Sequence, residues 1–292
     1  YSKLVTKINS RNRIDFGINL ENYSLSYVDS VHESWTNTEL NENEGEFVKQ
    51  LDVQKNNLLL TQAYSQWQHR FTNNLIFYAG LNFQHFGFNN SWSLEPRSSI
   101  EWNFKRNQSI SIGYGYHSQL PPMFLYFVET RTGQNEYIQT NNDIGFSKSN
   151  QVVLSYDKNF NPNLRMKIET YYQSQHDLPV ESKPSYFSLA NYGASFHQQR
   201  VDSLVNQGQS RNYGVELTFE KFFSNNYYFL LTTSLFDSKY RGSNDVLRNT
   251  AFNGKYVVNL LGGYEHPVGN RGILALNLRF VAAGGKRYTP LD

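Results

Sequence analysis

Hydrophobic and polar residues alternate one by one along much of the chain. From Ile14 to Leu20 every second residue is a large hydrophobic one, and Asp15, Gly17 and Asn19 lie between them. A period of two places the apolar side chains on one face of an extended strand, and helical spacing does not fit. The same alternation recurs in segments 75–84, 110–116, 164–169, 213–220 and 274–280. The chain is therefore predicted to be all-β.

Two kinds of connection separate the predicted strands. Short polar turns are expected at residues 10–13, 72–74, 105–108, 157–163, 221–226 and 266–272. Long connections are expected at residues 29–56, 88–97, 118–150, 174–210 and 238–254. Because short and long connections alternate, an antiparallel up-and-down sheet would carry all its turns at one end and all its long loops at the other. Transmembrane β-barrels have this asymmetry, with short periplasmic turns and longer extracellular loops.

The less hydrophobic face of the predicted strands favours a membrane barrel over a soluble sandwich. In a soluble sandwich that face is usually rich in Lys and Glu. Here it carries mainly Asn, Gln, Ser, Thr, Gly and Tyr, which suits a watery or plugged lumen. Aromatic residues such as Trp67, Phe71 and Trp102 gather near strand ends, as in the girdles of membrane barrels. About 11 or 12 strands are expected, each near the roughly 9–11 residues that a tilted membrane strand requires.

Composition narrows the classes of function. The chain has 292 residues, of which 16% are aromatic and 18% charged, and its mean hydropathy is −0.61. It contains no run of the roughly 18–20 apolar residues that a membrane helix needs, and its aromatic content disfavours disorder. A net charge of +2 offers no general attraction for phosphate, so nucleic acid is not an expected partner. The absence of cysteine excludes disulfides and thiolate chemistry.

Several sequence stretches are distinctive. The most specific are residues 212–222 (NYGVELTFEKF), 234–240 (SLFDSKY) and 248–254 (RNTAFNG). Supporting stretches are residues 95–97, 117–121, 169–173 and 284–290. Together they resemble the barrel domain of TonB-dependent outer-membrane receptors of the Bacteroidetes type. The resemblance covers nearly the whole chain from about Phe71 onward, and the first 60 residues match only in pattern.

The resemblance implies an integral bacterial outer-membrane receptor and transporter for a scarce nutrient, which is not an enzyme and uses no cofactor. Its extracellular loops bind the ligand, and the lumen of a barrel of about 22 strands carries it. An N-terminal plug fills the lumen and connects it to a TonB-type energy-transducing complex. Outer-membrane lipid surrounds such a barrel, and a surface lipoprotein is a further partner of one subgroup whose signatures are not found here.

No linker divides the sequence, so residues 1–292 are expected to form a single partial barrel domain. No plug sequence is recognised, and residues 289–292 (TPLD) do not end in a strand with a terminal aromatic residue. About half a barrel leaves two sheet edges unpaired, which lipid does not tolerate. The chain is therefore interpreted as a fragment that lacks the N-terminal plug and the C-terminal strands.

Ligand contacts in such a receptor are expected from aromatic and cationic side chains on the long loops. Cations suit an acidic ligand or a metal chelate, whereas aromatic rings suit a sugar or a macrocycle. The same residues would be expected equally well in loops that are simply exposed to solvent. The candidates are Tyr126, Phe127, Arg131 and Tyr137 in the 118–150 loop, Phe196, His197 and Arg200 in the 174–210 loop, and Arg241 in the next.

Catalytic and metal chemistry have weaker candidates. The adjacent His176 and Asp177 lie where a strand leaves for a long loop, and they offer a general base at a barrel rim. A solvated loop explains this pair more simply. His117 and Ser118 are neighbours and point to opposite faces of a strand, so they do not easily form one dyad. No spacing of the histidines builds a metal site.

Two rival interpretations therefore stay open beside the nutrient receptor. One is a secreted or surface all-β module, a propeller or a lectin, that binds glycans without transport. The other is a barrel hydrolase that uses the His176 and Asp177 rim pair. A lipid-facing belt would make the protein depend on detergent, which a lectin would not.

Overall fold

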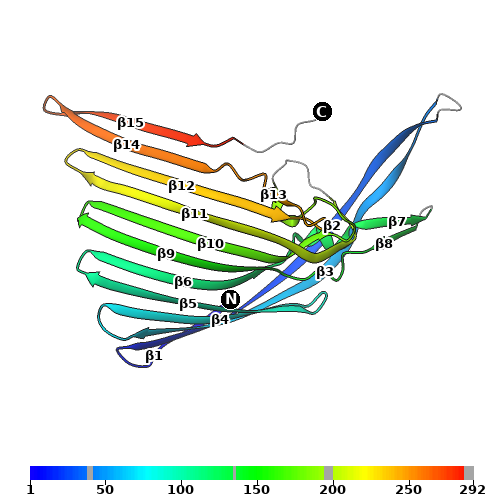
Figure 1. Cartoon of the computed structure of the whole chain (residues 1–292), viewed down its shortest axis with the longest axis horizontal. Helices are drawn as coiled ribbons and strands as arrows, with labels where there is room; N and C mark the ends of the chain where they lie inside the picture. The colour runs from blue at the N-terminus through cyan, green and yellow to red at the C-terminus, as the bar shows by residue number, and fades with distance from the viewer. Residues whose placement is uncertain (38–41, 134–135, 194–199, 286–292) are drawn as a thin grey trace.

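The computed structural model describes residues 1–37, 42–133, 136–193 and 200–285, and about three quarters of them lie in antiparallel strands (Figure 1). The strands are β1 (Ser2–Lys7), β2 (Asn12–Asn37), β3 (Glu42–Arg70), β4 (Leu75–Phe86), β5 (Ser91–Lys105), β6 (Gln108–Gln119), β7 (Glu129–Gly133), β8 (Glu136–Gln139), β9 (Ser147–Asn161), β10 (Leu164–Glu181), β11 (Leu204–Ser224), β12 (Tyr227–Arg241), β13 (Leu247–Asn249), β14 (Tyr256–Val268) and β15 (Gly272–Ala283). Two short 3-10 helices are η1 (Met123–Phe127) and η2 (Leu189–Asn191). Across the described ranges, no helix has the length and hydrophobicity needed to cross a membrane.

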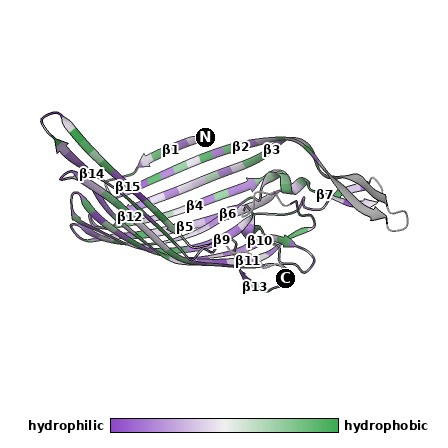
Figure 2. Cartoon of the chain, turned by 90° about the horizontal axis from the view of Figure 1, so that it is seen from above, coloured by the Kyte–Doolittle hydropathy of each residue, from purple (hydrophilic) through white to green (hydrophobic). Residues whose placement is uncertain are grey.

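Strands that follow one another along the chain are also neighbours in space. They form a 13-stranded sheet with the order β1-β2-β3-β4-β5-β6-β9-β10-β11-β12-β14-β15, and β13 pairs beside β12. Strands β7 and β8 form a separate two-stranded sheet. Figure 2 shows the large sheet curving into an open trough, with β1 and β15 as its two edges. The prediction of an all-β, antiparallel up-and-down architecture is confirmed.

The connections agree with the prediction at one end of the sheet and differ in part at the other. All six predicted short connections are turns, and they lie together on the left of Figure 1. The prediction of a long loop at residues 88–97 is wrong, because only the four residues 87–90 join β4 to β5. Asn89 accepts a hydrogen bond from the Ser91 N–H at 3.2 Å, and Asn90 has a φ of 56°, so the two asparagines make a tight turn.

The loop expected at residues 29–56 is also absent. Strands β2 and β3 instead continue as a hairpin whose strands have 26 and 29 residues, and it projects beyond the rest of the sheet (Figure 1). Their pairing continues across register shifts at Tyr23/Leu25 and Asp29/Ser30. Such bulges interrupt the alternation without ending the strand, so in the sequence they resemble a loop.

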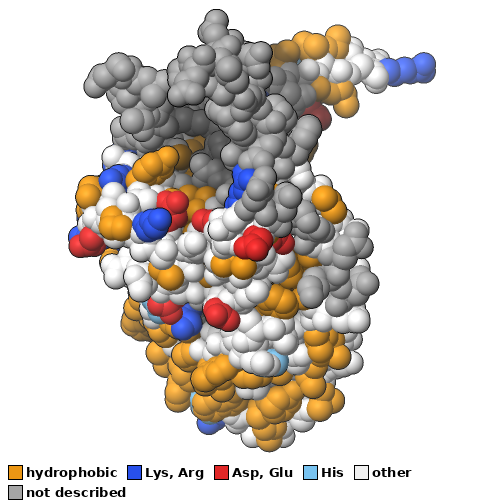
Figure 3. Space-filling view, turned by 90° about the vertical axis from the view of Figure 1, so that its right-hand side faces the viewer, with side chains coloured by type: hydrophobic (Ala, Val, Ile, Leu, Met, Phe, Trp, Pro, Cys, Tyr) orange, Lys and Arg blue, Asp and Glu red, His pale blue; other side chains and the backbone are white. Residues whose placement is uncertain are grey.

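Apolar side chains lie together on one face of the sheet because the pairing register aligns them. Ile112 on β6 lies opposite Ile100 on β5 and Leu154 on β9, and Val215 on β11 lies opposite Leu235 on β12. These five side chains are 42–56% exposed. Seen from the loop end, hydrophobic side chains cover the lower margin of the molecule in Figure 3, below most of the charged ones in view. An exposed apolar surface of this extent is typical of a face that contacts another apolar phase.

The opposite face of the same strands is polar. It carries the residues that alternate with the apolar set, among them Gln66, Asn82, Arg97, Gln151 and Asn212. The cavities described below open onto this face. The polar face therefore lines the inside of the trough, and the apolar face forms its outside.

Glycines on the polar face make room for tyrosine rings from the neighbouring strand. Gly214 pairs with Tyr171, and a Cβ atom on Gly214 would lie 2.8 Å from the Tyr171 hydroxyl and 2.7 Å from the Leu235 carbonyl oxygen. An aromatic ring that covers a cross-strand glycine supports the strand at that point. Gly17 with Tyr64 and Gly263 with Tyr228 repeat the arrangement.

We expect Gly214→Ala to lower the free energy of unfolding by about 1–3 kcal/mol, because the added methyl group overpacks the site. Urea titration of the protein refolded in detergent micelles measures this change. Gly113→Ala is the matched control on the same face, since its new Cβ atom would come no closer than 3.7 Å to the Ser99 side chain. Equal losses in the two variants would show that the ring contact is not responsible.

Candidate functional site

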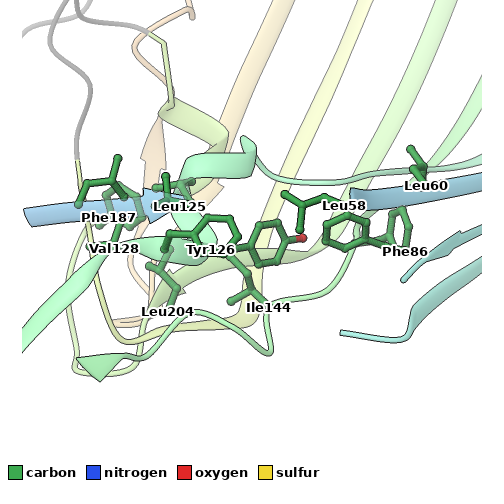
Figure 4. Packing of buried hydrophobic residues seen from close by; sticks show 13 residues of the cluster. Leu58, Leu60, Phe86, Leu125, Tyr126, Val128, Ile144, Phe187 and Leu204 are labelled. Atoms are coloured by element: carbon green, nitrogen blue, oxygen red, sulfur yellow. The ribbon is translucent and has the colours of Figure 1, made fainter. Parts of the chain in front are cut away.

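The hydrophobic core of the chain lies at the loop end of the trough. Around η1, Leu125, Tyr126 and Phe127 are fully buried and belong to one cluster with Leu58 of β3 and Phe86 of β4 (Figure 4). Both strand residues lie on the polar-face side of their strands, where the lumen begins. The 120–146 connection therefore folds inward over the lumen, and its aromatic residues anchor it there.

A buried asparagine fastens this connection to the next one. The Asn141 side-chain amide donates to the carbonyl oxygens of Leu125 and Val201, both at 2.8 Å. Its Oδ1 atom accepts from the backbone N–H of Leu204 at 2.9 Å. Since Asn141 is fully buried and its bonds reach two connections and the start of β11, it holds these segments as one platform above the strands.

A buried carboxylate bridges β5 and β6 near the loop end, where these strands pair no further than Arg97. Glu95 is fully buried and accepts hydrogen bonds from the Ser118 N–H at 2.9 Å and from the Ser118 hydroxyl. It also accepts from Asn82 at 3.0 Å, Gln84 at 2.5 Å and Arg97 at 2.6 Å. The side chain thus replaces the missing backbone partner of Ser118 and closes the wall of the lumen.

Between the platform and the strands lies an open cavity of about 680 Å³, here called the loop-end cavity. Its wall includes Ser147, Ser149, Tyr171, Gln173, Tyr192, Ser210, Asn212, Phe236, Ser238, Thr250 and Phe252. A second cavity of about 680 Å³ lies nearer the middle of the strands and is lined by residues such as Lys3, Tyr78, Arg97 and Gln151. His117 lines both, so the two cavities are neighbours along the lumen.

A row of hydrogen bonds crosses three strands on the wall of the loop-end cavity. Thr250 donates to the Ser238 hydroxyl at 2.8 Å, and Ser238 donates to Asn212 Oδ1 at 2.5 Å. Asn212 then donates to Gln173 Oε1 at 2.9 Å. These side chains are held in fixed orientations by one another, so this part of the wall is preorganised.

The loop-end cavity carries little charge. Among the described residues that line it, Lys148 alone is an Asp, Glu, Lys or Arg, and the Lys148 ammonium lies 2.9 Å from the Asp177 carboxylate. Burial raises the pKa of the Tyr192 hydroxyl, so this ring stays neutral at ordinary pH. Among the described residues, no group of three or more His, Asp and Glu side chains could hold a metal ion.

The family model described as TonB dependent receptor-like, beta-barrel, matches residues 5–292 of the chain. The chain belongs to this family of TonB-dependent receptor barrels. It is an integral protein of the bacterial outer membrane, and the exposed apolar face of its sheet is the lipid-facing surface. This membership supports the receptor interpretation over the two rivals, a secreted glycan-binding module and a barrel hydrolase.

Solved structures share the fold of this receptor barrel at low identity. The ferric yersiniabactin uptake receptor FyuA from Yersinia pestis has a TM-score of 0.64 and 13% identity, covering 97% of this chain and 41% of that chain. The FrpB iron transporter from Neisseria meningitidis has a TM-score of 0.61 and 13% identity. The match covers 95% of this chain and 41% of that chain. The outer membrane transporter YddB from Escherichia coli has a TM-score of 0.57 and 11% identity. The match covers 96% of this chain and 45% of that chain. This barrel thus spans less than half the length of these proteins. A search of curated proteins gives no match.

Four of the predicted ligand residues belong to the 120–146 connection of the receptor, but they lie in different surroundings. Tyr126 and Phe127 are fully buried in the hydrophobic cluster, so they hold the platform and present no surface to a ligand. Arg131 on β7 lies opposite Tyr137 on β8 in the small hairpin that projects at the loop end (Figure 1). The structure does not bring these two pairs together.

The remaining candidates occupy the next two connections. Arg200 forms an ion pair with Asp29 and donates a hydrogen bond to the Tyr27 hydroxyl at 3.3 Å, so it ties its loop to the long β2 strand. Arg241 at the end of β12 forms an ion pair of 2.8 Å with Asp245, and its side chain is partly exposed. Phe196 and His197 lie outside the described residues.

The residues considered for catalysis have structural partners instead. Asp177 pairs with Lys148 at 2.9 Å and lies 3.4 Å from the His176 ring. Ser118 directs its hydroxyl to Glu95, and the His117 ring lies over Gly115 rather than beside Ser118. Asp177 and Ser118 are therefore held by partners in the wall of the receptor.

Sequence reasoning missed the residues that build the site. Ser149 and Ser210 lie in alternating segments, and continuing the two-residue period toward the loops would have placed them on the lumen face. Glu95 stands out in the sequence only as part of the 95–97 stretch. Asn141 carries no local signal, because it bonds Leu125 and the Val201 carbonyl 60 residues away.

The buried hydroxyl of Tyr126 allows the structural role of this residue to be tested by mutation. It is buried and has no hydrogen-bond partner among the described residues, and burial raises the pKa of Tyr126. We expect Tyr126→Phe to leave the free energy of unfolding unchanged or slightly higher, since an unpaired buried polar group is removed. Tyr213→Phe is the contrast, because its hydroxyl donates to Asp237 at 3.1 Å and its loss should cost about 1 kcal/mol. If urea titration showed that Tyr126→Phe loses more free energy of unfolding than Tyr213→Phe, the Tyr126 hydroxyl would not be an unpaired buried group.

Proposed function

We propose that this receptor takes up a scarce nutrient across the outer membrane, with its extracellular loops capturing the ligand and the barrel lumen carrying it. The observation that carries the proposal is the two-faced sheet. Its outside is apolar, its inside is polar, and a cavity opens at the end where the long connections lie. This is the arrangement that a transport barrel requires.

The proposal includes further parts of the same protein. Strands β1 and β15 are the edges of the sheet, and unpaired backbone groups at those edges need partners in lipid. Further strands that close a barrel of about 22 would supply them. An N-terminal plug in the polar lumen would link the receptor to a TonB-type complex. The distinctive stretches at residues 212–254 support the Bacteroidetes type.

Among the described loop residues, the predicted ligand residues differ in how well they could reach a ligand. Arg131, Tyr137 and Arg241 lie on the connections at the open end, whereas Tyr126 and Phe127 are buried below them. We therefore propose that the first three contact the ligand during capture and that Arg200 positions its loop. Phe196 and His197 keep their place as ligand candidates in the 174–210 connection.

The experiment compares nutrient uptake in cells with and without the receptor. Labelled ferric siderophores, haem, cobalamin and neutral oligosaccharides are supplied one at a time at limiting concentration. Uptake of at least one compound should fall at least tenfold when the receptor is deleted, and equally when the TonB-type protein is deleted. Unchanged uptake of every compound in the receptor deletion would contradict the proposal.

A further inference from the structure

A row of tyrosine side chains marks the loop-end boundary of the lipid-facing surface. Tyr172 of β10 pairs with Tyr213 of β11, and both side chains are about half exposed on the apolar face. Tyr114 on β6 and Tyr256 at the start of β14 are exposed on the same face, close to this level. Tyrosine rings gather at the headgroup level of membrane barrels. The membrane boundary is therefore expected to cross the sheet at this row.

The height of the apolar surface agrees with this boundary. Tyr213 pairs with Asp237 of β12, and Tyr227 begins β12 at the turn end. Positions 227 and 237 are ten residues apart, which is about 33 Å along the strand and about 25 Å along the membrane normal at the usual tilt of about 40°. The apolar band of an outer-membrane barrel has about this height. Side chains beyond Tyr213 on the loop side therefore lie among lipid headgroups.

Three cations, here called the cation patch, lie on this outer face just beyond the tyrosine row. Arg211 on β11 and Lys239 on β12 are cross-strand partners on adjacent strands, about 7 Å along the strands beyond Tyr213 (Figure 1). Lys255, the third cation, directly precedes β14. Arg211 is exposed and pairs with no carboxylate in the part of the chain that the structure describes. Like charges directly opposite each other on one sheet face repel, so this arrangement indicates an external anion.

A buried carboxylate holds the two lysines of the patch together. The Lys239 ammonium lies 3.4 Å from one oxygen of Asp237, and the Lys255 ammonium contacts the other oxygen. Asp237 also accepts hydrogen bonds from Tyr213 at 3.1 Å and from Asn253 at 2.8 Å, which fix its position. Because one negative charge faces three positive charges, the group keeps a net charge of +2. Asp237 therefore positions the lysines without neutralising the patch.

A shallow groove joins the cation patch to the apolar surface. Its volume is about 720 Å³, and its lining includes Lys255, Asp237, Tyr172, Val215 and Leu235. One end of the groove is thus charged, and the other end is lined by hydrocarbon side chains. A lipid would use both ends, because its phosphate meets the cations while its acyl chain covers the apolar side chains. A free anion would use only the charged end.

We infer that the loop end of β11 and β12 binds the phosphate group of an anionic lipid from the surrounding leaflet. The phosphate lies among Arg211, Lys239 and Lys255, and an acyl chain of the same lipid lies in the groove beside Val215 and Leu235. Guanidinium and ammonium groups form strong, charge-assisted hydrogen bonds to phosphate oxygens. The inference does not depend on which nutrient the receptor carries, since it concerns the outside of the barrel.

The test measures lipid binding to the receptor purified from outer membranes in a neutral detergent. The probe is monophosphoryl lipid A, the reference is the same glycolipid without its phosphate, and native mass spectrometry measures the bound fraction. The receptor should bind the phosphorylated probe at least tenfold more tightly than the reference. Arg211→Gln and Lys239→Gln should each weaken binding of the probe about fivefold, the effect of one cation near an anionic membrane surface.

Lys158→Gln is the matched control. Lys158 lies on the same outer face, but it is near the turn end of β9, with its ammonium 4.5 Å from the centre of the Phe160 ring. Its replacement should leave binding of the probe unchanged. Arg211→Gln should also keep wild-type resistance to urea, because no ion pair within the described chain is lost. This second measurement separates a loss of binding from a loss of folding.

Three results would overturn the inference. The first is a phosphorylated probe that binds no better than the phosphate-free reference. The second is binding that Arg211→Gln and Lys239→Gln leave unchanged, or that Lys158→Gln weakens equally. The third is displacement of the probe by inorganic phosphate at the same concentration, which would make the patch a site for a free anion. None of them would affect nutrient uptake through the lumen, which the uptake experiment tests separately.

Discussion

Replacing Leu154 with arginine is expected to destabilise the folded barrel by about 2–4 kcal/mol, the cost of a cation at the middle of the lipid-facing surface. Leu154 lies at the centre of β9, is 45% exposed and pairs with Ile112 on the apolar face. A guanidinium group at this depth loses its hydration, and no acidic side chain on the apolar face lies opposite it to compensate. Urea titration of protein refolded in phospholipid vesicles measures the loss.

The adjacent residue supplies the control for this prediction. Val153 points to the opposite face and lines the cavity in the lumen, so an arginine there reaches the polar interior. Val153→Arg should therefore lose less than about 1 kcal/mol, since lumen positions tolerate charge. If Val153→Arg lost as much stability as Leu154→Arg, the two faces would not differ, and the membrane orientation derived for the sheet would be wrong.

Replacing Glu95 with alanine is expected to lower the free energy of unfolding by about 3–5 kcal/mol. The carboxylate is fully buried and accepts from the Ser118 N–H and hydroxyl, Asn82, Gln84 and Arg97. Hydrogen bonds to a charged acceptor contribute about 1.5–3 kcal/mol each, and several are lost at once. The half-exposed Arg97 can be hydrated, so most of the loss comes from the buried donors.

Glu101→Ala tests whether this loss is specific to the bridge between β5 and β6. Glu101 lies on the same strand and face, but its side chain accepts a hydrogen bond from Asn103 alone among the bonds described, at 3.1 Å. We expect it to cost less than about 1 kcal/mol. The measurement is the urea midpoint of both variants in the same vesicles. Similar midpoints would show that Glu95 contributes only as an ordinary lumen residue.

Much of the architecture was predictable because its signal is local. The alternation around Ile112 and Leu154 placed the strands and their apolar face, and the polar turns gave the short connections at one end. The prediction failed where two local signals resemble each other. The bulges near Leu25 and Ser30 resemble the start of a loop, and Asn89 with Asn90 turns the chain within four residues where a long connection was expected.

The candidate site was much less predictable. Tyr126 is an aromatic residue on a long connection, which predicts a ligand contact, yet it is buried in one cluster with Leu58 and Phe86. An aromatic side chain has the same sequence signature whether it meets a ligand or a core. Asn141 has no distinguishing sequence signal either, because its hydrogen-bond partners lie 16 to 63 residues away.

The order of residues by itself determined that the chain forms an antiparallel sheet with one apolar and one polar face, since side-chain direction in a strand depends only on counting by two. Only the tertiary structure decided which buried polar groups find a hydrogen-bond partner, and which residues supply it. Glu95 meets Ser118 and Asn141 meets Val201 across 23 and 60 residues of chain. Such pairings arise when the sheet curves and the loops fold inward, and no local pattern encodes them.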